Sequence, residues 1–155
     1  MKADKIKRMI SWVLFLVYMI ALSYFLFFSE KYGRVTGTEE YRYNLIPLNE
    51  IKRFIKYHEI LGYKSLIINI AGNILAFAPF GFFMPIVSPQ DNRVLRVVVT
   101  GCCFSLLIEM LQLVFKIGIF DVDDILLNTI GVTVGYMGFR IAARIVGRIT
   151  CHEEK

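Results

Sequence analysis

The sequence is poor in the residues that build reactive centres. It holds two histidines, three cysteines and one tryptophan among 155 residues. His58 and His152 lie far apart with no ligand spacing around them, which argues against a metal site of the zinc type. Cys102 and Cys103 lie within an apolar run and Cys151 lies near the end of the chain, so they do not form a disulfide framework. No Ser–His or Cys–His pairing is visible, and the sequence offers no evident nucleophile.

Charge is also scarce, and hydrophobic residues dominate. Charged residues make up 20% of the chain and hydrophobic ones 56%, with a mean hydropathy of +0.56. The 18 Lys and Arg against 13 Asp and Glu give a net charge of +5. These basic residues flank apolar segments and do not gather in one groove. We therefore expect contacts with the lipid bilayer and its anionic headgroups, and none with nucleic acid.

The apolar residues come in long runs. Residues 9–28 include no charged residue, and a helix of about 20 apolar residues crosses a bilayer core of ~30 Å. The run is longer than the ~7–15 apolar residues of a cleavable signal sequence, so it predicts an uncleaved first span. Three further spans are predicted at about 66–87, 94–115 and 122–146. The sequence thus predicts an all-α integral membrane protein, a compact bundle of about four transmembrane helices forming a single domain over residues 1–155.

The connection between the first and second spans is too polar to cross the membrane but has a helical pattern. From Asn49, a suitable N-cap, apolar and basic residues fall on opposite faces. The apolar face carries Ile51, Phe54, Ile55 and Leu61, and the polar face carries Lys52, Arg53, Lys56 and Glu59. We expect an interfacial amphipathic helix that lies in the headgroup plane or packs on the end of the bundle. Basic residues before the first span and at 140–148 favour a cytoplasmic location for both termini, although their excess over the other side is small.

Polar side chains cluster at one membrane face. In a chain with four spans, the first and third connections lie on the same side, where the second span begins and the third ends. Asn69 and Asn73 share a helix face near the start of the second span, and Glu109 and Gln112 share one near the end of the third. The candidate ligand-binding residues at this face are Asn44, Asn69, Asn73, Glu109, Gln112, Asp121, Asp124 and Asn128.

The acidic residues of this set allow two interpretations. A carboxylate at the centre of a membrane helix costs about 2.5–3.5 kcal/mol, and Glu109 lies some two turns inside its span, so a functional role is favoured there. Asp121, Asp123 and Asp124 precede or begin the fourth span, where the helix dipole favours negative charge. For Asp123 we favour this structural interpretation. Glu109 and Asp124 are the candidate catalytic residues if the protein is an enzyme.

Small residues at a spacing of four predict surfaces where helices approach closely. Two prolines also interrupt the second span and predict a kink. The small residues are Gly131, Gly135 and Gly138 in the fourth span and Gly72 and Ala76 in the second, and the prolines are Pro79 and Pro85.

Four ordered segments resemble the VanZ-like family of bacterial membrane proteins, which is named for a teicoplanin-resistance determinant. They are Asn44-Leu-Ile-Pro47, Asn69-Ile-Ala-Gly-Asn-Ile-Leu-Ala-Phe-Ala-Pro-Phe-Gly81, Ser105-Leu-Leu-Ile-Glu-Met-Leu-Gln112 and Asp121-Val-Asp-Asp-Ile-Leu-Leu-Asn-Thr-Ile-Gly131. The resemblance covers residues 43–136 and adds Pro47 and Pro79 to the candidate positions. It implies a multi-pass protein of the bacterial cytoplasmic membrane that influences glycopeptide susceptibility. Many relatives carry an Arg where Gly118 stands here, with Lys116 nearby.

Three functions remain open at this stage. The first is a binding or accessory role at the outer leaflet, on a lipid-linked cell-wall precursor or a glycopeptide. The second is a membrane enzyme that acts on a polyprenyl-phosphate type of lipid, using Glu109 or Asp124 with a divalent cation, since carboxylate and amide oxygens are the ligands Mg²⁺ prefers. The third is a structural clamp, in which acids and amides satisfy each other. No other cofactor is expected, and the sequence leaves the oligomeric state open.

Overall fold

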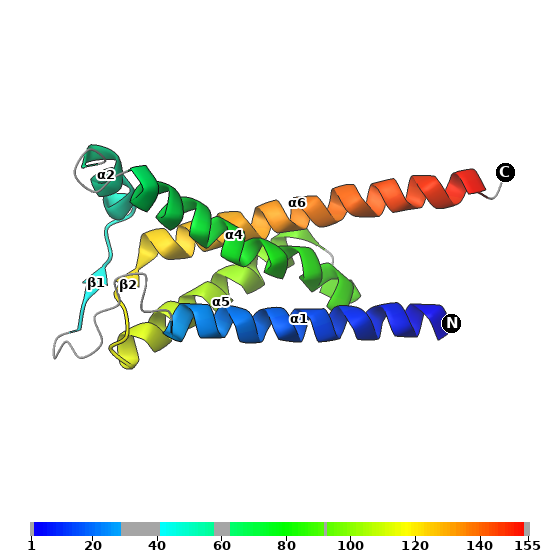
Figure 1. Ribbon diagram of the computed structural model, residues 1–155, viewed down its shortest axis with the longest axis horizontal. Helices are drawn as coiled ribbons and strands as arrows, with labels where there is room; N and C mark the ends of the chain where they lie inside the picture. Colours follow the sequence, from blue (N-terminus) through cyan, green and yellow to red (C-terminus); the bar gives the residue numbers. More distant parts are fainter. Residues whose placement is uncertain (1, 29–40, 58–62, 92, 154–155) are drawn as a thin grey trace.

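The computed structural model describes residues 2–28, 41–57, 63–91 and 93–153 (Figure 1). Four long helices dominate it, and short elements connect them. The long helices are α1 (Lys2–Phe28), α4 (Tyr63–Val87), α5 (Val94–Val114) and α6 (Val122–Glu153); the short elements are β1 (Tyr43–Asn44), α2 (Asn49–Lys56), η2 (Pro89–Asp91) and β2 (Phe120–Asp121). The amphipathic helix predicted from Asn49 is α2, whereas the predicted positions Glu59 and Leu61 lie outside the described residues.

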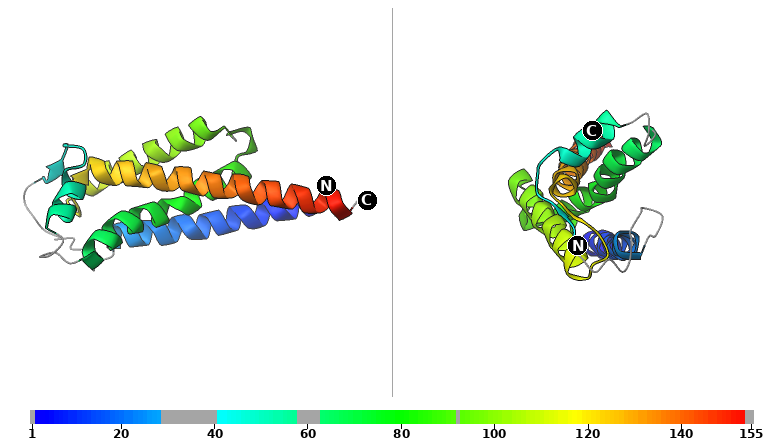
Figure 2. Two further views of the ribbon diagram at one scale, coloured as in Figure 1. Left: turned by 90° about the horizontal axis from the view of Figure 1, so that it is seen from above. Right: turned by 90° about the vertical axis from the view of Figure 1, so that its left-hand side faces the viewer.

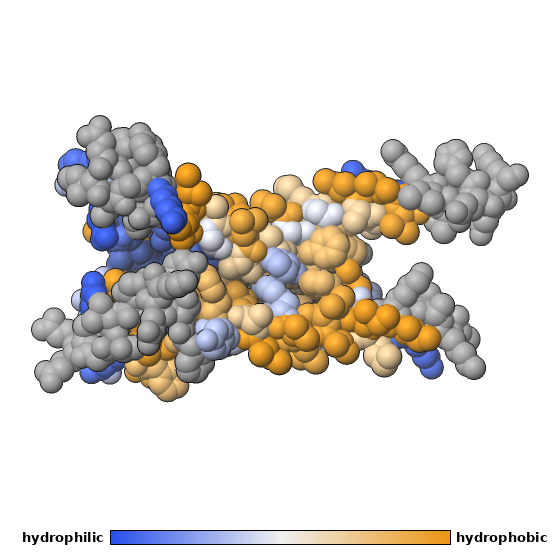
Figure 3. Space-filling view, in the orientation of Figure 1, coloured by the Kyte–Doolittle hydropathy of each residue, from blue (hydrophilic) through white to orange (hydrophobic). Residues whose placement is uncertain are grey.

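Each long helix contains a stretch apolar and long enough to cross a membrane. These stretches are Arg8–Phe27, Ile67–Val87, Val94–Val114 and Val122–Val146, and every predicted span boundary lies within one residue of them. Orange hydrophobic residues cover the middle of the molecule in Figure 3, and blue hydrophilic residues gather at the end that holds α2. The prediction of an all-α membrane bundle with about four spans is therefore confirmed.

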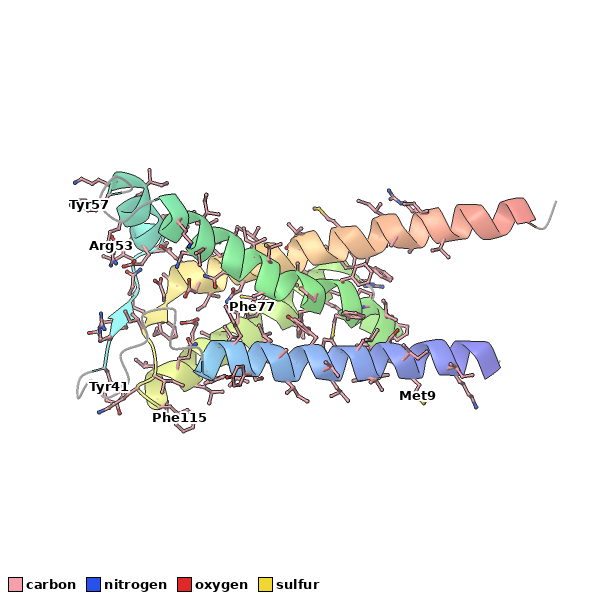
Figure 4. The ribbon with its side chains drawn as sticks, in the orientation of Figure 1. Met9, Tyr41, Arg53, Tyr57, Phe77 and Phe115 are labelled. Atoms are coloured by element: carbon pink, nitrogen blue, oxygen red, sulfur yellow. The ribbon has the colours of Figure 1, made fainter. Side chains whose placement is uncertain are left out.

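Alternate crossings bring distant segments to one end of the bundle. Figure 1 shows β1, α2 and β2 together at one end and both chain termini at the other. Viewed along the bundle in Figure 2, α6 lies between α4 and α5, and α1 lies beside α4. In Figure 4 the labelled Tyr41, Arg53 and Tyr57 mark the polar end, Phe77 marks the middle and Met9 the opposite end.

The closest helix contact joins α4 to α6. A Cβ added to Gly131 would collide with the backbone of Ile74, and one added to Gly135 would collide with the backbone of Ala78. Glycine at these positions lets the two backbones touch directly, as small residues four apart do in membrane helices. The predicted packing surface at Gly131 and Gly135 is therefore confirmed. Gly138 makes only an ordinary contact, with the Phe82 ring at 3.8 Å from its would-be Cβ.

The prediction for α4 was wrong in one respect. A Cβ on Gly72 would meet nothing within 4 Å, whereas one on Gly81 would collide with the backbone of Val132. The small-residue surface of α4 thus lies at Ala78 and Gly81, because α6 crosses α4 beside these two residues. The helix α4 continues through both prolines that the sequence placed in it.

Aromatic rings attach the outer helices to this pair. The rings of Phe80 and Phe104 stack at 5.2 Å between centroids and join α4 to α5, and Phe15 of α1 lies 5.9 Å from the Phe80 ring. The Tyr18 hydroxyl donates a hydrogen bond of 2.7 Å to the Ala76 carbonyl. The core is therefore a continuous apolar interior that holds α1 and α5 against α4.

A matched pair of substitutions tests the α4–α6 contact. Gly135→Ala should lower the free energy of unfolding by about 1–3 kcal/mol, since the new methyl group meets a backbone that cannot move aside. The same change at Gly72 should be neutral or should stabilise the helix by up to about 1 kcal/mol, because its surroundings are open. Thermal unfolding of both variants in detergent measures the difference. Equal midpoints for the two would show that the close contact is absent.

Candidate functional site

A two-residue parallel bridge brings the first and third connections together. Tyr43 pairs with Phe120 and Asn44 pairs with Asp121, and the Phe120 amide donates to the Arg42 carbonyl at 3.0 Å. The Asn44 Nδ2 atom then donates to Asp121 Oδ1 at 3.0 Å. Two candidate residues that lie 77 positions apart in the sequence are thus in direct contact.

Asp121 is the N-cap of α6. Its Oδ1 atom accepts a hydrogen bond of 2.8 Å from the Asp123 amide, as a capping carboxylate does at the second residue of a helix. Burial raises the pKa of the Asp121 carboxyl, and the negative charge of Asp123 adds to that increase. The hydrogen bonds from Asp123 and Asn44, and the charge of Arg53, act in the opposite direction. Asp121 therefore holds its proton to a higher pH than an ordinary aspartate.

Asp123 caps a different helix, α2. Its carboxylate accepts hydrogen bonds from the amides of Leu48, Glu50 at 2.9 Å and Ile51 at 3.3 Å, and its side chain is 1% exposed. Leu48 adopts the left-handed conformation, with φ of 64°, at the start of this helix.

The predicted capping role of Asn49 was wrong. Asn49 is the first residue of α2, and its side-chain amide donates to Asn44 Oδ1 at 3.3 Å. The capping oxygen comes from Asp123 instead, because the fold places the start of α6 directly beside the start of α2. Asp123 is therefore structural, although the helix that it caps is not its own.

The two candidates on α5 contact backbone groups of neighbouring segments. Glu109 is 3% exposed, and its Oε2 atom accepts from the Asp121 amide at 3.1 Å. Gln112 is 5% exposed and donates from Nε2 to the Leu26 carbonyl at 3.0 Å, near the end of α1. Gln112 thus satisfies a carbonyl of the last turn of a membrane helix, which has no partner within that helix.

Asp124 and Asn73 form a half-buried pair between α6 and α4. Asn73 Nδ2 donates to Asp124 Oδ1 at 2.6 Å. Asn69 lies one turn before Asn73 and is also half-buried, but it has no hydrogen bond to the side chains described around this pair. The structure therefore brings Asn73 and Asp124 together and leaves Asn69 at the edge of the group.

Asn128 lies deeper, between α6 and α5. It is 2% exposed, and its Nδ2 atom donates to Ser105 Oγ at 2.9 Å. Its Oδ1 atom is buried and has no hydrogen-bond partner among the described residues. Ser105 is fully buried and was absent from the predicted set. Its position one turn before Glu109, on the same face of α5, is the sequence signal that could have identified it.

Lys116 lies outside this group. Its Nζ atom is 4.8 Å from the centroid of the Tyr41 ring, in a cation–π contact at the surface of the polar end. A Cβ added to Gly118 would lie 3.4 Å from the Cβ atom of Gln112, which is an ordinary van der Waals contact.

The helix α2 presents basic and apolar side chains to its surroundings. Lys52 and Lys56 are exposed, and Arg53 forms an ion pair of 2.7 Å with Glu50. Ile55 and Tyr57 are 55% and 44% exposed. Such a surface is typical of a helix at the headgroup level of a membrane.

No group of three or more His, Cys, Asp and Glu residues within the described ranges has the arrangement that a metal ion requires. The carboxylates described above accept hydrogen bonds from backbone amides or side-chain amides instead.

The fold and this polar end define a multi-pass membrane protein with buried acids and amides at one end of a helical bundle. The family model described as VanZ/LLP1 matches residues 15–143, which is most of the chain. The chain therefore belongs to the VanZ-like family. No curated protein and no solved structure matches it.

Removal of the Asp123 carboxylate tests its structural role. Asp123→Ala leaves three amides of the α2 start without their acceptor, so the free energy of unfolding should fall by about 2 kcal/mol, the upper end for a lost cap. Amide exchange in α2 should become faster. Glu50→Gln, which breaks an exposed ion pair in the same helix, should change stability by less than about 1 kcal/mol. Unchanged exchange in α2 of Asp123→Ala would contradict the capping role.

Proposed function

We propose that this protein has a binding or accessory role at the outer leaflet of a bacterial cytoplasmic membrane. Its polar end binds the headgroup of a lipid-linked cell-wall precursor or a glycopeptide, and thereby changes teicoplanin susceptibility. The observation that carries the proposal is the half-buried Asp124–Asn73 pair, which lies at the start of a membrane span within reach of the headgroup region. Membership of the VanZ-like family supports the choice of substrate class.

The different partners and burial of the acidic residues favour ligand binding at Asp124. Asp121 and Asp123 accept backbone amides and hold elements of the fold in place. Asp121 also accepts the side-chain amide of Asn44, but Asp121 is buried. Asp124 accepts the side-chain amide of Asn73 on another membrane helix, and neither residue of this pair is fully buried. Carboxylate and amide groups that are partly open to the surface can exchange a mutual hydrogen bond for bonds to a sugar, a peptide or a phosphate-linked headgroup.

The basic face of α2 supports the same location. Lys52 and Lys56 are exposed at the end of the bundle that holds the pair. Positive side chains near a membrane surface attract phosphate groups of lipids, by about 1 kcal/mol for each Lys or Arg. A lipid-linked ligand would thus have its phosphate near α2 and its polar head near Asp124.

The structural clamp explains part of the polar end. It accounts for Asp123 and Gln112, whose partners are backbone groups at helix ends. It does not account for the Asn128 Oδ1 atom, which has no hydrogen-bond partner in the described part of the chain, because a clamp gains nothing from a buried acceptor without a donor. For this reason we favour a binding role over a purely structural one. The enzyme alternative, with Glu109 or Asp124 acting on a polyprenyl-phosphate lipid, has no specific support in the geometry.

Susceptibility measurements on Asp124→Asn test the binding role. In cells where the protein lowers teicoplanin susceptibility, this variant should return susceptibility to the level of cells without the protein. Its abundance in the membrane should not change, because an amide can still bond to Asn73. Thr129→Val, which removes a hydroxyl that donates to the Ile125 carbonyl of its own helix, should keep the full phenotype.

A charge swap separates binding from clamping. Asn73→Asp combined with Asp124→Asn keeps one carboxylate and one amide in contact but moves the charge to α4. If the pair is only a clamp, the single variant and the double variant should both keep function, because the contact between positions 73 and 124 survives in each; a ligand site at Asp124 should lose function in both. Unchanged susceptibility in Asp124→Asn at normal abundance would reject the proposal.

Cysteine labelling tests the outer-leaflet location. In a variant without Cys102, Cys103 and Cys151, the exposed positions Ile46 and Arg144 can each be replaced by Cys. A membrane-impermeant maleimide should label the variant Ile46→Cys in intact cells. It should label Arg144→Cys only after lysis. The reverse pattern would place the polar end in the cytoplasm.

A further inference from the structure

A line of polar residues runs from the half-buried Asp124–Asn73 pair into the bundle and ends at Asn128. Asp124 and Asn128 lie one turn apart on the same face of α6, and Glu109 and Ser105 lie one turn apart on the facing side of α5. Two hydrogen bonds join these segments: the Asp121 amide, just before α6, donates to Glu109, and Asn128 donates to Ser105. We call this line the polar seam; its residues are Asn73, Ser105, Glu109, Asp121, Asp124 and Asn128.

The polar seam ends at an apolar floor. One turn beyond Ser105 lies Gly101, whose added Cβ would be 2.6 Å from a methyl group of Val132, one turn beyond Asn128. Val132 and Val97 are fully buried. Asn128 lies six residues into α6 and thus about 9 Å below the start of the span at Val122. The seam therefore ends against apolar side chains, and its two partly exposed residues, Asn73 and Asp124, lie at the membrane face.

The side-chain amide of Asn128 has only one of its two polar atoms hydrogen-bonded within the seam. Its Nδ2 and Oδ1 atoms each need a partner, and Ser105 supplies one for Nδ2. If the amide were turned over, its oxygen would accept from Ser105 and its nitrogen would lose its acceptor, so one atom remains without a partner either way. A buried polar atom in this state costs about 1–3 kcal/mol. Helix side chains lean toward the N-terminus, so the Asn128 amide leans toward the turn that carries Asp124.

Acidic side chains, which accept hydrogen bonds when they are ionised, predominate in the polar seam. Glu109, Asp121 and Asp124 are carboxylates, each with lone pairs for about four hydrogen bonds, and the charge of Arg53 acts on Asp121 from outside. A ligand that complements the seam donates several hydrogen bonds, and a positive charge on the ligand favours the ionised form of these acids. A primary ammonium group does both, since it has three N–H donors and no acceptor.

On this basis we propose that the polar seam binds a primary ammonium group at the end of a short flexible arm, such as an ethanolamine phospholipid headgroup. The assignment rests on the proposed binding role of this end of the bundle and names the chemical group that the seam would take. The ammonium donates to the Asn128 Oδ1 atom at the inner end of the seam and to the carboxylates of Asp124 and Glu109, which lie nearer the membrane face. Its phosphate then lies outside the bundle, on the side of the exposed Lys52 and Lys56.

Lipid binding to the full chain in detergent tests this proposal. The probes are phosphatidylethanolamine and phosphatidylcholine, because the choline group keeps the positive charge but has no N–H donor. Native mass spectrometry should give a dissociation constant for the first bound lipid that is about tenfold or more lower for phosphatidylethanolamine, as the loss of charge-assisted hydrogen bonds implies. N-acetylated phosphatidylethanolamine, which lacks the positive charge, should bind as weakly as phosphatidylcholine.

Two variants locate the effect. Asn128→Leu replaces the amide by an apolar side chain of similar shape and should remove the preference for phosphatidylethanolamine while the thermal midpoint stays equal or rises. Thr129→Val, at the next residue, should retain the preference. Competition by free ethanolamine would support the ammonium site and would indicate that its natural ligand is a soluble amine. Equal binding of the two phospholipids, or a preference that survives in Asn128→Leu, would overturn the assignment.

The outcomes for the ammonium site and for the proposed function can be separated. If both phospholipids bind alike but Asp124→Asn still abolishes the effect on teicoplanin susceptibility, the ammonium assignment fails and the binding role stands. If the protein prefers phosphatidylethanolamine but Asp124→Asn retains the full effect on teicoplanin susceptibility, the ammonium site exists and the proposed link to glycopeptides fails.

Discussion

The contact between the backbones of α4 and α6 sets the position of the Asp124–Asn73 pair at the polar end of the bundle. Gly131 and Gly135 let α6 lie directly on α4, and this contact fixes which face of α6 points toward α4. Asp124 lies seven residues before Gly131 and therefore on the same face. Its contact with Asn73, next to the Ile74 backbone that Gly131 touches, is a consequence of that packing. The apolar helix surface thus positions the polar pair, without any need for a strong polar interaction.

The remaining polar contacts secure segments that the bundle cannot hold by packing. The segment from β1 to α2 lies beyond the end of the spans, where few apolar neighbours are available (Figure 1). Asp123 fixes the start of α2 through three backbone amides, and the β1–β2 bridge fixes Asn44 beside Asp121. Backbone groups near a membrane need internal partners more than groups in water do. Carboxylates at the start of α6 are well placed for this, since the helix dipole already favours their charge.

The sequence predicts the number of spans and the segments that share one end of the bundle, because both depend on hydropathy and chain connectivity. Four apolar runs with polar connections allow one alternating path, and that path puts Asn44 and Asp121 at the same end. The partners of single side chains depend on distances of an ångström between helices, which periodicity does not determine. Asp123 was assigned to its own helix start, yet its acceptor atoms face amides 72 to 75 positions away. Gly72 has the right spacing but the wrong face, and only the crossing of α6 over Ala78 shows which face packs.

The energies of these contacts indicate why the inner half of the polar seam is unusual. Hydrogen bonds between membrane helices contribute only about 0.6 kcal/mol on average, so the bond from Asn128 to Ser105 adds little stability. The Asn128 Oδ1 atom has no partner in the described part of the chain, and burying it costs more free energy than the bond to Ser105 contributes. An apolar side chain at position 128 would pack against the same neighbours without this cost. The amide of Asn128 therefore does not serve stability. A binding site, in contrast, requires a buried acceptor that a donor group of the ligand can reach.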